Sequence, residues 1–229
     1  MAAAERIAIV EDDDEMGAYL VTLLKAEGYR CERYATPGRF LDSLVKQKPD
    51  LVLMDMGLPG MDGREIIRVL RLNPETKHLL IVAVSAQTNS NNILTGIQSG
   101  ADDYFSNPVD AEALLVRIRN LLCRFADRTP IEEKAVEVGP LSISLEEHTC
   151  RLNGKPLALT RLEFDLLLFF LRQSDRVLTR GVLLENVWGG TPDMQTRTVD
   201  KHVETLRKKL GAFGERFETV VGIGYLFRK

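Results

Sequence analysis

The chain has 229 residues, of which 45% are hydrophobic and 28% charged, a composition that is typical of globular proteins and excludes a fibrous or globally disordered chain. Its net charge of −3 is unevenly divided: residues 1–133 contain 15 Lys and Arg against 21 Asp and Glu, a balance of −6, whereas residues 134–229 contain 15 against 12, a balance of +3. This asymmetry indicates two domains with different partners.

Membrane and redox signals are absent from the sequence. No apolar run approaches the roughly 20 residues that cross a bilayer, and the start of the chain lacks a secretory signal pattern. We therefore expect a cytoplasmic protein without a membrane partner. Cys31, Cys123 and Cys150 are odd in number and form no C-x-x-C pair, which excludes a disulfide framework and a zinc knuckle.

The first half alternates β-rich runs with longer helical patterns. Several of the runs are continuously apolar, as expected for strands that are covered on both faces. This pattern predicts an α/β fold, a doubly wound five-stranded parallel sheet with helices between the strands. The predicted strands are Ile7–Val10, Tyr29–Tyr34, Leu51–Met54, Leu80–Val84 and Asp103–Phe105.

Acidic residues follow two of these predicted strands. Glu11 and Asp12 come after the first, and Asp55 comes after the third. Because the carboxyl ends of parallel strands lie at one edge of a sheet, these carboxylates should converge and repel one another unless a proton or a cation intervenes. Oxygen ligands of this kind suit Mg²⁺, with Mn²⁺ as a second choice. The alternative is that acidic residues here only cap the next helix, as expected for Asp13 or Asp14.

The second half has a different pattern, after a polar linker predicted at 126–134. Short alternating runs predict an antiparallel meander, and Thr160 with Glu163 forms a capping box before a helix. The predicted strands are Val136–Val138, Leu141–Leu145, Thr149–Leu152 and Pro156–Leu159; the predicted helices are Leu162–Leu171, Thr179–Val187 and Thr196–Leu210; the predicted closing hairpin is Phe217–Phe227.

The last predicted helix is amphipathic. An apolar stripe faces the interior, and the opposite face is mostly cationic. Such a helix fits the major groove of DNA, although a solvated charged face is an equally simple explanation. The stripe consists of Val199, Val203, Leu206 and Leu210; the charged face consists of Arg197, Lys201, Glu204 and Lys208, flanked by Arg207 and Lys209.

Four sequence blocks in the first half carry a family resemblance. They are Val-Glu-Asp-Asp at 10–13, Leu-Met-Asp-Met-Gly-Leu-Pro-Gly-Met-Asp-Gly at 53–63, Ala-Val-Ser-Ala at 83–86 and Gly-Ala-Asp-Asp-Tyr at 100–104. In this order and spacing they resemble the receiver domain of two-component response regulators, which implies a flavodoxin-like receiver over residues 1–125.

The resemblance implies a role for each matching residue. Asp55 would accept a phosphoryl group from a sensor histidine kinase. Mg²⁺ would be held by Asp12, Asp55 and the carbonyl of Gly57, with Glu11 acting through water. Ser85 would donate a hydrogen bond to the phosphoryl group, and Tyr104 would turn inward as Ser85 moves. A dehalogenase-like phosphatase is disfavoured, because it needs an aspartate where this chain has Gly57.

The receiver pattern is incomplete at three positions. Asn107 replaces the family's lysine, and a neutral amide binds a phosphoryl group more weakly than an ammonium does. On the family's dimerisation face, Ile93 and Ala113 stand in place of charged residues. We therefore expect a coupling to phosphorylation that is weakened or works differently. An exposed ion pair between Asp103 and Arg117 should survive on the dimerisation face, with either a more apolar receiver homodimer through Ile93 or no stable dimer.

Residues 135–229 resemble the winged-helix domain of the OmpR/PhoB subfamily. The matching blocks include Leu183-Leu-Glu-Asn-Val-Trp-Gly, Arg197-Thr-Val-Asp-Lys-His-Val and Val221-Gly-Ile-Gly-Tyr-Leu-Phe. The resemblance implies a transcription regulator of double-stranded DNA, with 189–195 as a loop that can meet RNA polymerase. The residues expected at DNA are Trp188, Arg197, Lys201, His202, Thr205, Arg207 and Lys208.

Two alternatives stay open. The first is a pseudo-receiver that works without phosphorylation, suggested by Asn107, Ile93 and Ala113. The second is a winged-helix protein-interaction module, suggested by Val221 and Glu204, which stand where the family has basic residues. A free-standing enzyme is least favoured, because the only chemistry in the pattern is self-phosphorylation and its reversal.

Overall fold

The computed structural model describes residues 4–85, 99–106, 108–126, 135–189 and 197–229. The chain divides into two compact units, Met1–Leu122 and Cys123–Lys229, and each is described by itself. Within the described residues, no helix is both long and apolar enough to cross a membrane.

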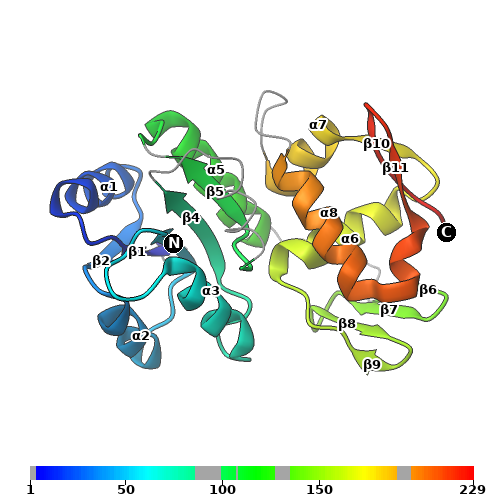
Figure 1. Cartoon of the computed structure of the whole chain (residues 1–229), viewed down its shortest axis with the longest axis horizontal. Coiled ribbons are helices and arrows are strands. Elements are labelled where there is room, and N and C mark those ends of the chain that lie inside the picture. Colours follow the sequence, from blue (N-terminus) through cyan, green and yellow to red (C-terminus); the bar gives the residue numbers. More distant parts are fainter. Residues whose placement is uncertain (1–3, 86–98, 107, 127–134, 190–196) are drawn as a thin grey trace. The chain divides into compact units, whose positions relative to one another are not determined.

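The first unit is a parallel sheet with the strand order β2-β1-β3-β4-β5 (Figure 1). Consecutive residues of β1, β3 and β4 are buried, so both faces of the sheet are covered, as the apolar runs predict. The strands are β1 (Arg6–Val10), β2 (Arg30–Tyr34), β3 (Leu51–Asp55), β4 (Leu80–Ser85) and β5 (Asp103–Ser106). The helices are α1 (Asp14–Ala26), α2 (Pro37–Lys46), α3 (Gly63–Leu72) and α5 (Ala111–Ala126). The predicted doubly wound α/β fold is confirmed.

Short polar side chains start the helices of this unit. Asp13 caps α1 by accepting a hydrogen bond from the Met16 amide at 2.8 Å, and Thr36 and Asp62 cap α2 and α3. Each cap satisfies a backbone N–H that has no partner within its helix. The predicted capping role holds for Asp13.

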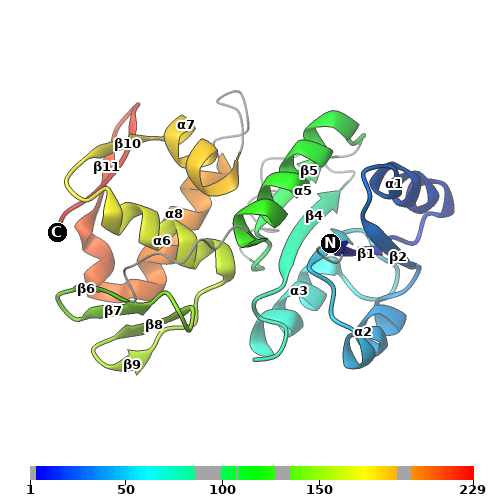
Figure 2. The ribbon, with the colours of Figure 1, turned by 180° about the vertical axis from the view of Figure 1, so that it is seen from behind.

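The second unit is a winged helix-turn-helix domain (Figure 2). A four-stranded antiparallel sheet, in the order β6-β7-β8-β9, precedes the helices, and a sheet in the order β10-β12-β11 closes the unit. The strands are β6 (Ala135–Val138), β7 (Leu141–Ser144), β8 (Thr149–Leu152), β9 (Lys155–Pro156), β10 (Val177–Thr179), β11 (Phe217–Val220) and β12 (Gly224–Phe227); the helices are α6 (Arg161–Arg172), α7 (Arg180–Leu183) with its π-helical extension Leu184–Trp188, α8 (Arg197–Leu210) and a 3₁₀ turn at Gly211–Arg216.

Two strands differ from the prediction. β9 has only two residues, because the chain then turns inward to bury Leu159 and Thr160 at the start of α6. β10 was not predicted, since a three-residue strand is too short to show an alternating pattern. Its pairing with β12, for example Leu178 opposite Tyr225, defines it instead.

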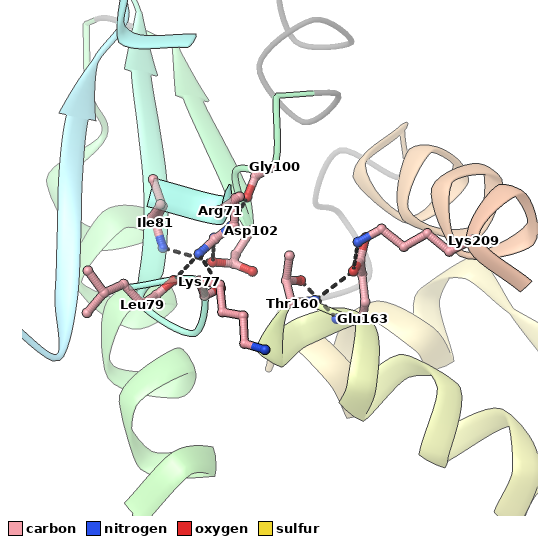
Figure 3. A network of polar contacts seen from close by, with 9 residues as sticks. All are labelled: Arg71, Lys77, Leu79, Ile81, Gly100, Asp102, Thr160, Glu163 and Lys209. Atoms are coloured by element: carbon pink, nitrogen blue, oxygen red, sulfur yellow. Dashed lines mark hydrogen bonds and ion pairs between the residues drawn. The ribbon is translucent and has the colours of Figure 1, made fainter. Parts of the chain in front are cut away.

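In each unit, a charged side chain connects separate segments of the chain (Figure 3). In the first, the Arg71 guanidinium donates to the carbonyls of Lys77, Leu79 and Gly100 and pairs with Asp102 at 2.7 Å. In the second, the predicted capping box of Thr160 and Glu163 is present, and Lys209 of α8 also contacts the Glu163 carboxylate at 2.5 Å. Lys209 therefore ties α8 to the start of α6.

Candidate functional site

The structure brings Glu11, Asp12 and Asp55 together at the carboxyl edge of the sheet. β1 and β3 are neighbours with Val10 opposite Met54, so the residues that follow these two strands meet. One carboxylate oxygen from each of the three residues lies within 4.8 Å of the others. Glu11 is 6% exposed, whereas Asp12 is exposed and Asp55 half-buried.

The surroundings of Glu11 and Asp55 disfavour the ionised form of both carboxyl groups. Burial, followed by the charge of Asp55, raises the pKa of Glu11 to about 7. Burial also raises the pKa of Asp55, and the charge of Asp12 adds to this. A divalent cation would remove the repulsion, and oxygen-only ligands with an open side suit Mg²⁺. The donor set therefore fits the metal that the sequence predicts.

Asp55 lies in a tight backbone frame. Its Oδ1 accepts a hydrogen bond from the Gly57 amide at 3.0 Å. At Gly63, the first residue of α3, an added Cβ would lie 2.4 Å from the Asp55 carbonyl oxygen and 2.9 Å from Met56 Cα. The absent side chain of Gly63 thus lets α3 start directly against the end of β3, a constraint that the sequence pattern did not reveal.

We expect Gly63→Ala to disturb this frame. Both contacts are with backbone atoms that cannot swing aside, so the substitution should cost about 1–3 kcal/mol of unfolding free energy. Denaturant unfolding of the full chain measures this loss, and Gly38→Ala in α2, where an added Cβ meets nothing within 4 Å, is the control. Equal stability of the two variants would contradict the prediction.

The other predicted receiver residues are only partly covered by the structure. Ser85 ends β4, one residue beyond the Asp55–Val84 pair, and is buried. Tyr104 is buried in the core on β5. Asn107 and Ile93 lie outside the described residues.

We predicted that the ion pair between Asp103 and Arg117 would be exposed, and this prediction is wrong. The two side chains do pair, at 2.6 Å, but within one chain and with only 1% and 6% of their surface exposed. Nothing in the sequence pattern indicated that the carboxylate at the start of β5 faces the interior. As they stand, these residues do not form an exposed dimerisation contact.

Three of the residues predicted at DNA are buried in the second unit. Trp188 is fully buried and its ring lies 5.3 Å from that of His202, which is buried as well. Lys201 is only 4% exposed, and its ammonium pairs with Glu204 at 2.7 Å. Burial around the first turns of α8 extends well beyond the predicted apolar stripe, so these three side chains belong to the interior.

The remaining predicted residues of α8 differ in accessibility. Lys208 is exposed and pairs with Glu204 at 2.6 Å, and Thr205 is half-buried. Arg207 donates to the Phe217 carbonyl and to Thr219 Oγ1, so it anchors β11. The side chain of Arg197 lies outside the part of the chain that the structure describes.

Tyr225 connects three elements of this unit, which the sequence did not indicate. Its hydroxyl donates to Asp200 at 2.6 Å, and Asp200 also accepts from Arg180 at 2.6 Å. The guanidinium groups of Arg180 and Arg207 lie 5.1 and 5.5 Å from the ring centre. Burial, then the hydrogen bond to Asp200, raises the pKa of Tyr225 to about 12.

Comparison with known proteins agrees with this architecture. Residues 7–119 match the family "Response regulator receiver domain", and residues 154–227 match "Transcriptional regulatory protein, C terminal". Among solved structures, a RitR variant has a TM-score of 0.76 at 28% identity and covers 99% of this chain and 100% of its own. DrrB of Thermotoga maritima, an OmpR/PhoB homologue, has a TM-score of 0.52 at 28% identity with the same coverage.

Curated relatives match along nearly the whole chain. The DNA-binding response regulator MtrA of Mycolicibacterium smegmatis is 37% identical over 224 residues, with 96% of each chain covered. The phosphate regulon regulatory protein PhoB of Pseudomonas aeruginosa is 35% identical over 222 residues, also with 96% of each chain covered. The chain therefore belongs to the OmpR/PhoB subfamily of two-component response regulators.

Proposed function

We propose that this protein accepts a phosphoryl group at Asp55 from a sensor histidine kinase and regulates transcription by binding double-stranded DNA through its winged helix. The convergence of Glu11, Asp12 and Asp55 within 4.8 Å carries the first part of the proposal. We assign the receiver to 1–125, the linker to 126–134 and the DNA-binding domain to 135–229.

The proposed metal ligands are Glu11, Asp12, Asp55 and the carbonyl of Gly57, for Mg²⁺ or Mn²⁺. When bound, the cation neutralises the charge that spreads over the phosphoryl oxygens during transfer. Burial, then the charge of Asp55, raises the pKa of Glu11. This supports the assignment, because a bound cation would favour the ionised carboxylate and relieve the repulsion.

The Asp55 carboxylate is the proposed nucleophile. One of its oxygens forms the new bond to phosphorus as the bond between phosphorus and the imidazole nitrogen of the kinase breaks, and the imidazole leaves with the electron pair. The Gly57 amide orients the Asp55 carboxylate, and we assign to Ser85 a hydrogen bond to the phosphoryl group that results. Asn107 is assigned the position of the family's lysine.

We expect the full chain to gain one phosphoryl group when it is incubated with Mg²⁺ and acetyl phosphate. Mass spectrometry measures the product, and Asp55→Asn should abolish it, because an amide cannot attack phosphorus. Failure of the unmodified chain to react with acetyl phosphate or to bind beryllofluoride would instead favour the pseudo-receiver, in which phosphorylation plays no part.

DNA binding is proposed for the exposed side of α8 and the wing, with Arg197, Thr205 and Lys208 toward the DNA. Lys201, His202, Arg207 and Trp188 would support this surface from within, as their burial or bonding suggests. Glu204 limits the positive charge there, because it pairs with both Lys201 and Lys208.

We expect Glu204→Gln to strengthen DNA binding. The substitution removes an anion and frees the exposed ammonium of Lys208. We therefore expect the affinity for DNA to rise by up to about tenfold, with a salt dependence that corresponds to about one more released counterion. Lys208→Ala should change both in the opposite direction. Electrophoretic mobility shifts at several salt concentrations measure the effect, and unchanged salt dependence in both variants would contradict it.

A protein-interaction module is the second candidate for this domain. Val221, at 89% exposure, and Ile223, at 51%, present apolar side chains at the tip of the β11–β12 hairpin. Among the described side chains of α8, the three lysines each pair with a carboxylate. In this candidate the winged helix binds a subunit of RNA polymerase or another regulator instead of DNA. If the chain shifts no DNA fragment at low salt, this candidate replaces the first.

We also propose that the receiver forms a homodimer. Because Asp103 and Arg117 are buried in the chain, an interface at Ile93 would have to be largely apolar or to release this pair. Light scattering with and without beryllofluoride tests the proposal, and a monomer under both conditions would refute it.

A further inference from the structure

Five consecutive acidic residues, Glu11 to Glu15, follow β1, and the first four have different partners. The carboxylates of Glu11 and Asp12 join that of Asp55 in the candidate metal site. Asp13 is instead the N-cap of α1. Asp14 points to Arg33, whose Nη1 contacts its Oδ1 at 2.6 Å. Two of the four carboxylates are therefore held away from the site.

Arg33 does more than pair with Asp14. It lies on β2 opposite Ile9 of β1, so its side chain reaches the loop that follows β1. Its Nε donates to the Glu11 carbonyl oxygen at 3.0 Å, and its Nη2 donates to the Asp12 carbonyl oxygen at 3.0 Å. One planar guanidinium thus holds the backbone of both metal-site residues of this loop.

Gly17 provides the space through which Arg33 reaches the loop. A Cβ at Gly17 would lie 2.2 Å from Arg33 Nε and 2.4 Å from its Cδ. Glycine is otherwise unfavourable inside a helix such as α1. Its presence at this position is explained by the guanidinium that passes over it.

We propose that Arg33, accommodated by Gly17, is a positioning residue that holds Glu11 and Asp12 in the geometry that binds the divalent cation. The inference rests on the proposed magnesium site. Arg33 itself does not touch the cation; by fixing two carbonyls, it restricts rotation of the loop and so fixes the directions of the neighbouring carboxylates. Outer partners of this kind commonly change metal affinity by about 10–100-fold when they are lost.

Arg33→Lys is the decisive variant, since it keeps the positive charge but removes the planar set of donors. Calorimetric titration of the full chain with Mg²⁺ should show affinity about tenfold lower than that of the unmodified protein. Asp14→Asn is the matched control. It weakens the contact between residue 14 and Arg33 but leaves both hydrogen bonds from Arg33 to the carbonyls, so we expect a smaller loss of Mg²⁺ affinity. An Mg²⁺ affinity of the Arg33→Lys variant equal to that of the unmodified protein would overturn the proposal.

Gly17→Ala tests the same device without altering any charge or hydrogen-bonding group. We expect a similar loss of Mg²⁺ affinity, together with undiminished helix content in circular dichroism because alanine favours helix. The double variant Gly17→Ala/Arg33→Lys should lose no more than either single one, whereas additive losses would refute a shared mechanism. If the unmodified chain binds no Mg²⁺, the proposed function fails; if it binds and the variants bind equally, only this inference fails.

Discussion

Replacing Arg71 with alanine is expected to lower the free energy of unfolding of the first unit by about 3–5 kcal/mol. Asp102 is 1% exposed and Arg71 is 11% exposed at this ion pair. Removal of the guanidinium leaves a buried carboxylate without its counterion, and three backbone carbonyls lose a donor as well. The penalty arises from the charge that stays behind, rather than from the attraction that is lost.

Native-state hydrogen exchange of the full chain measures this effect, because peptides from β3 and β4 report on the first unit alone. Arg68→Ala on the same helix is the control: its side chain is exposed, so we expect a change within about 0.5 kcal/mol. Arg71→Lys should fall between the two, since one ammonium keeps the charge but cannot reach all four acceptors. Equal protection in Arg71→Ala and Arg68→Ala would contradict the prediction.

The acidic site could be predicted because it depends on a simple rule. Apolar runs indicate strands that are buried on both faces, and parallel strands end at one edge. Knowing where β1 and β3 end is then enough to bring Glu11, Asp12 and Asp55 together. No knowledge of side-chain packing is required for this step.

The supporting residues could not be predicted in the same way. Arg33 lies on an edge strand whose pattern is polar, and its role depends on the space above Gly17. Such a contact joins residues that are 16 positions apart and of unremarkable type. Gly63 is a similar case, because the position tolerates no Cβ atom so close to the backbone of Asp55.

The orientation of α8 shows a limit of hydrophobic periodicity. The stripe Val199, Val203 and Leu206 is buried as predicted, because a hydrophobic stripe locates the centre of the buried face. It does not give the width of that face. The burial of Lys201 and His202 therefore could not be predicted from a stripe of aliphatic residues, whereas the amphipathic helix itself could.

The pH dependence of stability should expose the cost of the acidic site. Without a divalent cation, we expect the full chain to lose about 3 kcal/mol of stability as the pH rises from about 4.5 to above 7. The pKa of Glu11 is about 7, against an ordinary value of 4.5. In this window the native state holds a proton that the unfolded chain has released, so unfolding releases a proton and rising pH favours it.

Mg²⁺ should cancel this loss, because it binds the ionised carboxylates of the native state and stabilises that state by mass action. Its affinity should in turn fall by up to about tenfold for each pH unit below 7, as the proton on Glu11 competes with the metal. Chemical denaturation at pH 5 and pH 8, in chelator and in excess Mg²⁺, measures both effects on one protein.

Glu11→Gln separates this carboxylate from every other titrating group. In chelator, the variant should be up to about 3 kcal/mol more stable than the unmodified chain at pH 8 and nearly equal to it at pH 5. Its stability should respond only weakly to Mg²⁺. Glu15→Gln, on the exposed side of α1, changes the net charge equally and should leave the pH profile intact. If both variants keep the pH dependence of stability of the unmodified chain, Glu11 is not the source of that dependence. If Glu11→Gln alone removes it, the carboxylate that destabilises the metal-free protein is also the one through which a cation stabilises it.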